Sequence, residues 1–384
     1  MMRRLAIMLY DLLITGGQVF DPLNKSFKKA DMAVAGGRVA RIAPSLEGEK
    51  ASEVIDASGL MVTPGLIDFH VHIFWLVHRI SIHPHNLVPR AGTTTMVDGG
   101  SAGAANFDAF KEFILTKSEL NLLAFLNISI LGQIFETQIP GMPSMNEYED
   151  LRLVNVSETV KCIEANRDLI VGVKVRAFHG LTNLTPVHAA LDAAEEADVP
   201  VMIHTSPPPP SVSQYMPLLR PGDIVTHLYH PQPGGLIDRQ GKIRQEYRDA
   251  RERGVLMETG LDRWHTDFEV MKRGVGEGFW PDIISTDVTR FNVEPFVRDV
   301  LFTASKLMAA GMPLEESLAA ITINPARAMT RPQLAELKEG GPANITVLEL
   351  LKEDITFVDF FGQSLKGKER LCCHWLINKG KVVK

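Results

Sequence analysis

Short apolar runs alternate with longer, helix-like stretches through the middle of the chain. Eight of these runs are predicted to be strands: Leu66–Ile73, Thr93–Gly99, Leu122–Ile128, Ile170–Arg176, Val201–Thr205, Ile224–His230, Val255–Thr259 and Ile283–Val288. Each run is short and apolar, as expected for a parallel strand that is covered on both faces. Eight strands that alternate with helices over ~270 residues favour a (β/α)8 TIM barrel, an α/β fold, over an open sheet.

Three of the intervening stretches have clear helix signals. Ser157–Arg167 begins with Ser157 as the predicted N-cap, and Thr185–Asp198 carries Pro186 at its first turn. Gly241–Arg253 is highly charged and is expected to lie on the outer, solvated surface of the barrel.

Both ends of the chain have a different pattern, in which short β-rich segments are separated by glycines. The predicted strands are Leu12–Ile14, Met32–Val34 and Arg38–Ile42 near the N-terminus, and Asn344–Leu348, Ile355–Val358 and His374–Ile377 near the C-terminus. Segments of this kind suggest hairpins. We expect the two ends to join in one small β domain.

The composition is that of an ordinary globular protein and argues against several classes of function. The 384 residues are 45% hydrophobic and 22% charged, which allows a large buried core. A net charge of −6 without a long Lys/Arg run argues against a nucleic-acid partner. Three cysteines cannot form a disulfide framework, and no stretch reaches the ~18 apolar residues of a membrane span. We therefore expect a cytoplasmic protein without membrane contact.

Six ionisable residues interrupt or end the predicted barrel strands. They are His70, His72, Lys174, His204, His227 and Asp287. His70 and His72 are two positions apart on a strand, so both imidazoles should face the interior of the barrel. In barrels of this kind the C-terminal ends of the strands carry the reactive groups.

Each of these residues alone has a structural explanation. A single histidine is more often a core residue, a buried lysine normally pairs with a carboxylate, and Asp287 could cap the helix that follows it. The whole set is harder to explain in this way, because burying so many ionisable groups is costly unless they are paired or bind a metal ion.

The order His-x-His, Lys, His, His, Asp resembles the amidohydrolase superfamily in its binuclear form, in which a lysine carbamate bridges two metal ions. Further matches run along most of the chain, at Val62–Asp68, Ala91–Thr95, Gly99–Ala104, Lys174–Arg176, Arg220–Asp223, Ile284–Asp287 and Asn324–Ala326. The closest resemblance is to the dihydroorotase-like amidohydrolase/deacetylase metallohydrolases. It implies a β-sandwich formed by residues 1–63 and 341–384, and a metal-dependent hydrolase barrel in residues 64–340.

The resemblance also implies a role for each of the six residues. Two divalent ions are expected, the more buried one held by His70, His72 and Asp287 and the more exposed one by His204 and His227. Lys174, carbamylated by carbon dioxide, would bridge them, and imidazole and carboxylate ligands suit zinc. A bridging water would lose its proton near neutral pH to become the nucleophile, while one ion polarises the scissile carbonyl. Asp287 would accept the proton and pass it to the leaving group.

Four residues are candidates for binding substrate. Arg176 lies two positions after Lys174, so it should face the same way and could clamp a carboxylate with two hydrogen bonds. Ser101, His179 and Arg290 lie just beyond predicted strand ends. Each of the four has an equally plain alternative as an ordinary loop residue or a member of a surface ion pair.

The chain departs from the family pattern at the mouth of the barrel. Relatives often carry Gly-His-Gly after the seventh strand and a histidine two residues past the catalytic Asp, where this chain has Leu261 and Thr289. Neither position belongs to the set of six, so the departure bears on the substrate, for which we expect a more apolar body. His265 and Trp264 lie nearby and could substitute in part. Asn344, where many relatives have Asp, is expected to be structural.

This pattern leaves four functions to consider. The first is hydrolysis of an acyl ester or amide bond in a small carboxylate-bearing substrate, such as an N-acyl amino acid or an O-acyl hydroxy acid. The second is opening of a cyclic amide, as in dihydroorotases and hydantoinases. Deamination is disfavoured because the deaminases of this superfamily typically use one metal ion and lack the strand-four lysine. A non-catalytic scaffold is disfavoured because this chain retains all six ligands, and we expect a homo-oligomer that acts on a small molecule.

Overall fold

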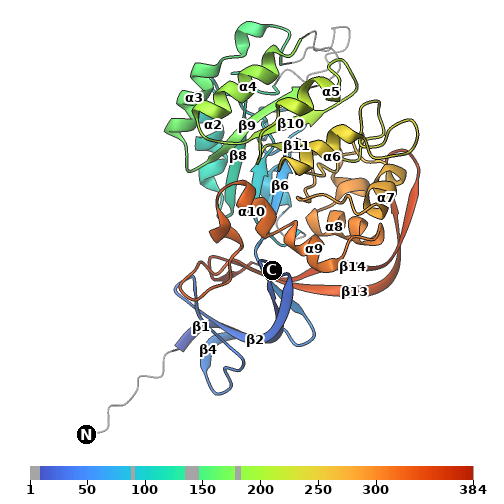
Figure 1. Ribbon diagram of the computed structural model, residues 1–384. Coiled ribbons are helices and arrows are strands. Elements are labelled where there is room, and N and C mark those ends of the chain that lie inside the picture. The colour runs from blue at the N-terminus through green and yellow to red at the C-terminus, as the bar shows by residue number, and fades with distance from the viewer. Residues whose placement is uncertain (1–8, 88–90, 135–146, 178–182, 384) are drawn as a thin grey trace.

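The computed structural model describes residues 9–87, 91–134, 147–177 and 183–383. Figure 1 shows that they form a barrel covered by helices and, below it, a smaller β domain to which both ends of the chain contribute.

Seven parallel strands follow one another around the barrel in sequence order. They are β6 (Leu66–Val71), β7 (Thr93–Asp98), β8 (Asn121–Asn127), β9 (Ile170–Ala177), β10 (Val201–Thr205), β11 (Ile224–Thr226) and β12 (Leu256–Met257). Nearly all of their residues are buried, because one face of each strand lies inside the barrel and the other lies beneath the helices.

The eighth predicted strand, Ile283–Val288, closes the barrel without forming a regular strand. This segment is bridged in parallel to Glu258, just after β12, and to Val71 at the end of β6. Its ladder is interrupted because Asp287 has a φ of +49°, outside the β region. The prediction of a continuous strand is therefore wrong here, although the predicted TIM barrel is confirmed.

The sixth and seventh strands are shorter than predicted. The predicted strand Ile224–His230 ends at Thr226 because the next residue, His227, has a φ of +68°. The predicted strand Val255–Thr259 is regular only over the two residues of β12. His227 consequently lies just past the end of its strand, where the backbone turns over the mouth of the barrel.

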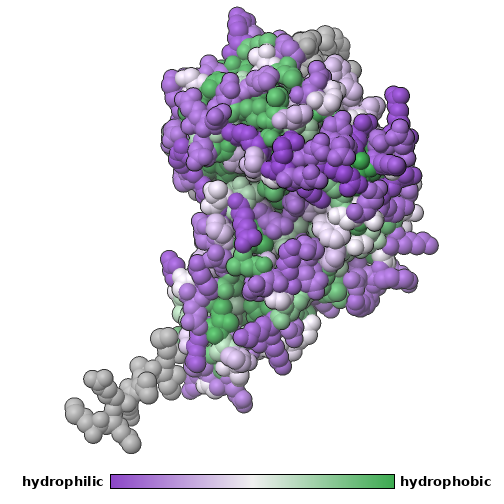
Figure 2. Space-filling view, in the orientation of Figure 1, coloured by the Kyte–Doolittle hydropathy of each residue, from purple (hydrophilic) through white to green (hydrophobic). Residues whose placement is uncertain are grey.

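Helices follow the strands around the outside of the barrel (Figure 1). The α-helices of the described residues are α2 (Phe107–Phe113), α3 (Val156–Ala165), α4 (Thr185–Glu196), α5 (Val212–Tyr215), α6 (Gln245–Glu252), α7 (Phe268–Gly276), α8 (Val300–Ala309), α9 (Leu314–Ala319) and α10 (Ile323–Ala328). The predicted N-cap Ser157 is wrong, because Asn155 caps α3 by accepting a hydrogen bond from the amide of Glu158. The charged α6 contributes to a hydrophilic part of the surface, as expected (Figure 2). None of the helices in the described ranges has the length and apolar character that crossing a membrane requires.

The smaller domain is one sheet of eight strands from both chain ends. Its order is β15-β14-β13-β5-β1-β2-β3, with β4 paired to β1. The strands are β1 (Leu9–Asp21), β2 (Ser26–Ala35), β3 (Arg38–Ala43), β4 (Lys50–Asp56), β5 (Met61–Pro64), β13 (Ile345–Val358), β14 (Ser364–Asn378) and β15 (Lys381–Val382). β5 links the two ends, because it pairs with β1 on one side and with β13 on the other. The apolar core between them, which includes Ile14, Val34, Val62 and Ile345, is consistent with the predicted β-sandwich.

The hairpin of β13 and β14 extends from this domain along the barrel, past α8 and α7 (Figure 1). The amide of Leu371 on β14 donates to the Ser305 hydroxyl of α8 over 2.9 Å. At the tip of the hairpin, Asp359 accepts a hydrogen bond from the first amide of α7, and Gln363 donates to Asp267 at the cap of that helix over 2.6 Å. The C-terminal segment therefore helps to hold the loop that precedes α7.

Candidate metal centre

All six residues of the predicted ligand set line one cavity at the C-terminal ends of the barrel strands. The cavity has a volume of about 500 Å³ and contains side chains of His70, His72, Lys174, His204, His227 and Asp287. His70 lies in β6, Lys174 in β9 and His204 in β10. The other three follow β6, follow β11 or lie in the segment that closes the barrel. The barrel topology alone brings these residues together, since they are up to 217 residues apart in the chain (70 to 287).

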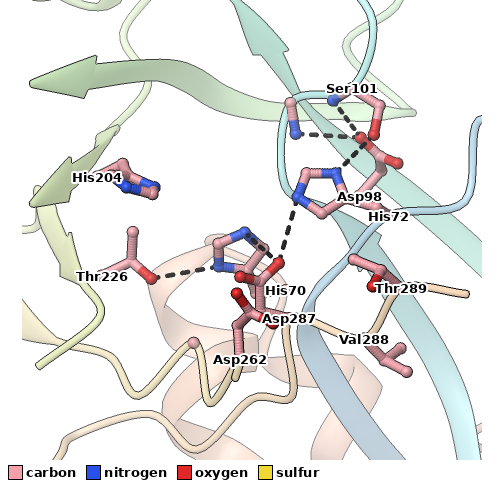
Figure 3. A network of polar contacts seen from close by, with 12 residues as sticks. His70, His72, Asp98, Ser101, His204, Thr226, Asp262, Asp287, Val288 and Thr289 are labelled. Carbon is pink, nitrogen blue, oxygen red and sulfur yellow. Dashed lines mark hydrogen bonds and ion pairs between the residues drawn. The ribbon is translucent and has the colours of Figure 1, made fainter. Parts of the chain in front are cut away.

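One carboxylate faces two imidazoles at the centre of this cavity (Figure 3). The Oδ1 atom of Asp287 lies 3.2 Å from Nε2 of His72 and 3.5 Å from Nε2 of His70. Three ligand atoms from these residues lie within 4.8 Å of one another. Two imidazole nitrogens and a carboxylate oxygen at this spacing are the donor set that zinc and related divalent ions prefer.

A second pair of imidazoles lies beside the first group. The Nε2 atom of His227 is 2.9 Å from the Nδ1 atom of His204, and it is 3.9 Å from Oδ2 of Asp287. Asp287 therefore lies between the two histidine pairs and can serve both.

Hydrogen bonds on the far side of three of the four rings fix the orientation of these imidazoles. The Nδ1–H of His227 donates to the carbonyl of Gly260 over 2.8 Å. The Nδ1 atom of His72 lies 2.7 Å from the Ser101 hydroxyl, and that of His70 lies 3.2 Å from the Thr226 hydroxyl. Such outer contacts set the tautomer and the ring orientation of metal-binding histidines.

Lys174 is buried beside the first histidine pair. Its Nζ atom lies 3.4 Å from Nε2 of His70, and its aliphatic chain passes so close to Gly100 that a Cβ there would lie 2.4 Å from the lysine Cβ. Gly100 also has a φ of +94°, which L-residues with side chains rarely adopt. Burial lowers the pKa of Lys174 from 10.5 to about 8.

Burial also determines the charge of the histidines. Desolvation, together with the nearby cationic groups, lowers the pKa of His70, His204 and His227 well below 6.5. These imidazoles are neutral at physiological pH, so each keeps a lone pair for a cation. Burial raises the pKa of Glu258, whose Oε2 lies 3.5 Å from Nδ1 of His70, to about 8.

Two of the metal-site residues have strained backbones. His227 and Asp287 have φ values of +68° and +49°, in a region that costs energy for residues other than glycine. Both are buried and held by neighbouring contacts, and strain of this kind is concentrated at functional sites.

Of the substrate-binding candidates that the structure describes, only Arg176 lines the cavity. Its Nε and one terminal nitrogen, however, donate to the buried carboxylate of Glu147, which balances its charge. Ser101 is fully buried behind His72 and orients that ring instead of facing the cavity. Arg290 is exposed with its guanidinium over Phe291, and it does not line the cavity. His179 lies outside the described residues.

Other cavity residues had weaker signals in the sequence or none. His265 stacks on His227 with ring centroids 4.0 Å apart, and its Nδ1 lies 3.2 Å from Oδ2 of Asp262. Burial by itself would raise the pKa of Asp262. Its interaction with His265 and the hydrogen bond from Asn292 outweigh that effect, so the pKa is lowered. Arg263 also lines the cavity. His265 and Asp262 follow the seventh strand, and proximity to a strand end was their only signal.

The two positions that lack the histidines of relatives differ in exposure to the cavity. Leu261 is buried and does not line it, whereas Thr289 does. Apolar surface comes from Ile80, Trp264 and Phe291. Asn344 is structural as expected, because its side chain accepts a hydrogen bond from the amide of Lys379.

Comparison with known proteins identifies relatives of this chain. No protein-family model matches the chain. The chain is 32% identical over 341 residues to a deacetylase from Agrobacterium fabrum, covering 88% of this chain and 82% of the relative. It is similar to the crystal structure of an adenine deaminase, with a TM-score of 0.89 and 28% identity over 98% of this chain and 100% of the other. It is also similar to the crystal structure of a dihydroorotase, with a TM-score of 0.87 and 29% identity over 97% and 98% of the two chains.

Proposed function

Since this chain belongs to the amidohydrolase superfamily, among its dihydroorotase-like hydrolases, we propose that it hydrolyses an acyl ester or amide bond of a small carboxylate-bearing substrate. The substrates that we have in view are N-acyl amino acids and O-acyl hydroxy acids. A deacetylase among the relatives supports acyl cleavage.

The observation that carries the proposal is the convergence of neutral imidazoles on one carboxylate. His70, His72 and Asp287 fit one divalent ion, and His204 and His227 fit a second. Gathering four imidazoles and a carboxylate in one buried site carries a desolvation cost, which two divalent ions bound there would help to offset. Bound there, two divalent ions would polarise the scissile carbonyl and make a water molecule acidic near neutral pH.

Lys174 is proposed to act as a carbamate between the two sites. Its lowered pKa leaves much of the side chain as the neutral amine at mildly alkaline pH. The nitrogen lone pair adds to the carbon of carbon dioxide, and the nitrogen then loses a proton, which gives an anion with two oxygen ligands. An uncharged amine would supply neither the charge nor the second ligand atom.

Asp287 is the proposed proton carrier. Its Oδ1 faces His70 and His72, and its Oδ2 points toward His227. From this central position the carboxylate can take the proton of the attacking water and deliver it to the leaving group.

The charge that binds the substrate carboxylate is proposed to come from Arg263 rather than Arg176. Glu147 occupies the guanidinium of Arg176. The Nε atom of Arg263 has no hydrogen-bond partner among the described residues, and its nearest acid, Asp262, is 4.0 Å away. Trp264 and Phe291 also line the cavity and favour an aryl or alkyl substrate body.

A second candidate is opening of a cyclic amide. The structural similarity to a dihydroorotase supports it, and the same metal-site residues would serve. A panel of aryl and alkyl N-acyl amino acids, O-acyl hydroxy acids and small cyclic ureides, assayed with zinc-loaded protein, separates the two. Activity on acyl acids is the expected result, whereas activity on cyclic ureides alone would contradict the first proposal and support the second.

A further inference from the structure

We propose that His265 is a third imidazole ligand for the ion held by His204 and His227, positioned for that task by Asp262. This inference rests on the metal centre of the proposed function and adds a residue to its set of six. One ring nitrogen of His265 lies within 4.8 Å of ligand nitrogens of both His204 and His227. The ring is stacked on His227 with an interplanar angle of 24°, and its centroid is 4.9 Å from that of His204.

Asp262 lies beside the ring, in the place from which a carboxylate commonly orients a metal-binding histidine. With Nδ1 of His265 3.2 Å from Oδ2 of Asp262, the other ring nitrogen is left for an ion. The carboxylate is itself held, because the side-chain amide of Asn292 donates to its Oδ1 over 2.7 Å. The same amide group donates to the backbone carbonyl of Asp287 over 2.9 Å. One asparagine therefore links the carboxylate of Asp262 to the backbone of Asp287.

The loop that carries His265 is also held from outside the barrel. Trp264 packs against Phe360 at the tip of the β13–β14 hairpin, with ring centroids 4.2 Å apart. Asp267, at the other end of the loop, caps α7 and accepts the hydrogen bond from Gln363 of the same tip. His265 lies between these two attachments, so little ordering of the loop is needed when the ring binds an ion.

His265 supplies an imidazole to a cavity that lacks two histidines often present in relatives. The chain has Leu261 and Thr289 where relatives often have histidines, and Leu261 is buried away from the cavity. His265, four residues after Leu261, returns an imidazole to the mouth of the barrel from a different backbone position. It lies beside His204 and His227, with which it forms a group of three imidazoles.

Metal affinity tests the proposal without any substrate. In His265→Ala, the dissociation constant of the weaker of two zinc ions, measured by chelator competition, is expected to rise at least about tenfold. The visible spectrum of the cobalt-loaded protein should change as well, because one nitrogen ligand is lost. Asp262→Asn should weaken the same ion by a smaller factor. His374→Ala, which removes an exposed histidine from β14, is the control and should leave both affinities unchanged.

An unchanged second dissociation constant in a folded His265→Ala variant would overturn the proposal. If the variant does not fold, a crystal structure of zinc-loaded wild type decides, with a His265 nitrogen about 2.0–2.1 Å from the ion expected and one beyond about 3 Å contradicting it. A wild-type protein that binds no ion at His204 and His227 would overturn both this inference and the metal centre. A wild-type protein that binds two ions, neither of them contacted by His265, would overturn this inference alone.

Discussion

The Nε2 atom of His227 lies 2.9 Å from the Nδ1 atom of His204, and the opposite nitrogen of His227 donates to the carbonyl of Gly260. Because that donation places the proton on Nδ1, Nε2 of His227 carries a lone pair directed at His204. A divalent ion held by both rings would take up the lone pairs of the two nitrogens.

The first prediction follows from this contact. His204→Ala should reduce bound zinc from two ions to one per chain, because His70, His72 and Asp287 remain as a separate ligand group. Chelation of wild type should lower its melting temperature, since saturation at 100 times the dissociation constant contributes about 2.7 kcal/mol. Elemental analysis and thermal unfolding measure both effects. Two ions in His204→Ala would contradict the assignment.

The second prediction concerns Lys174. Lys174→Ala should lose the binuclear metal content and the activity, because a carbamate that supplies charge and two oxygens is removed. Added short-chain carboxylates should restore part of both, since they provide a similar anion. Lys174→Arg serves as the control, because it keeps a cation that carbon dioxide does not modify. Two bound ions and full activity in Lys174→Ala would exclude the bridge.

The third prediction separates the roles of Arg176 and Glu147. Glu147→Gln should destabilise the protein by about 3 kcal/mol, because it leaves a buried guanidinium without its counter-charge. The double variant Glu147→Gln/Arg176→Met should recover much of this loss. Arg176→Lys should reduce kcat/KM equally for charged and neutral substrates. Urea unfolding measures the first two effects, and a selective loss on carboxylated substrates would restore Arg176 as the clamp.

The fourth prediction concerns Arg263. Arg263→Met should weaken transition-state binding of carboxylated substrates by about 1.5–3 kcal/mol, the scale of a hydrogen bond to a charged group. Neutral esters of the same acyl group should be affected much less. Comparison of kcat/KM for the two substrate series is the measurement, and an equal loss in both would show that Arg263 does not bind the carboxylate.

The fifth prediction uses Lys306, which is buried in α8 away from the metal centre. Burial lowers its pKa from 10.5 to about 7, and its ammonium hydrogen-bonds to the carbonyl of Phe296. Between pH 7 and 10 the unfolded chain binds more protons at this residue than the folded one, so this group makes folding more favourable as the pH rises. The stability of wild type relative to Lys306→Met should therefore increase by up to about 1.4 kcal/mol per pH unit. A difference that is constant from pH 6 to 10 would contradict the lowered pKa.

Much of the architecture could be predicted because its signals are local. Apolar runs of strand length indicated the barrel, and His70 and His72, two positions apart, could only point the same way on a strand. The prediction was wrong where individual backbone angles matter. His227 and Asp287 have positive φ values, and no pattern of apolar residues reports where a strand ends in such a conformation.

The charges around the cavity could not be predicted, because they depend on loops. In the sequence Arg176 resembles a free carboxylate clamp, but Glu147, 29 residues earlier and outside the described strands, binds its guanidinium. Ser101 resembled a substrate contact, but the register of β6 against β7 places it behind His72.

By itself, the sequence determined which ionisable side chains stand at strand ends, and a closed barrel of parallel strands leaves such residues only one place to meet. Only the tertiary structure decided which of the nearby charges remain available to a ligand. That outcome depends on contacts between loops, such as those of Glu147 with Arg176 and of Asp262 with His265. Loops have no periodic pattern to reveal their course, so their partners become known only when the chain is folded.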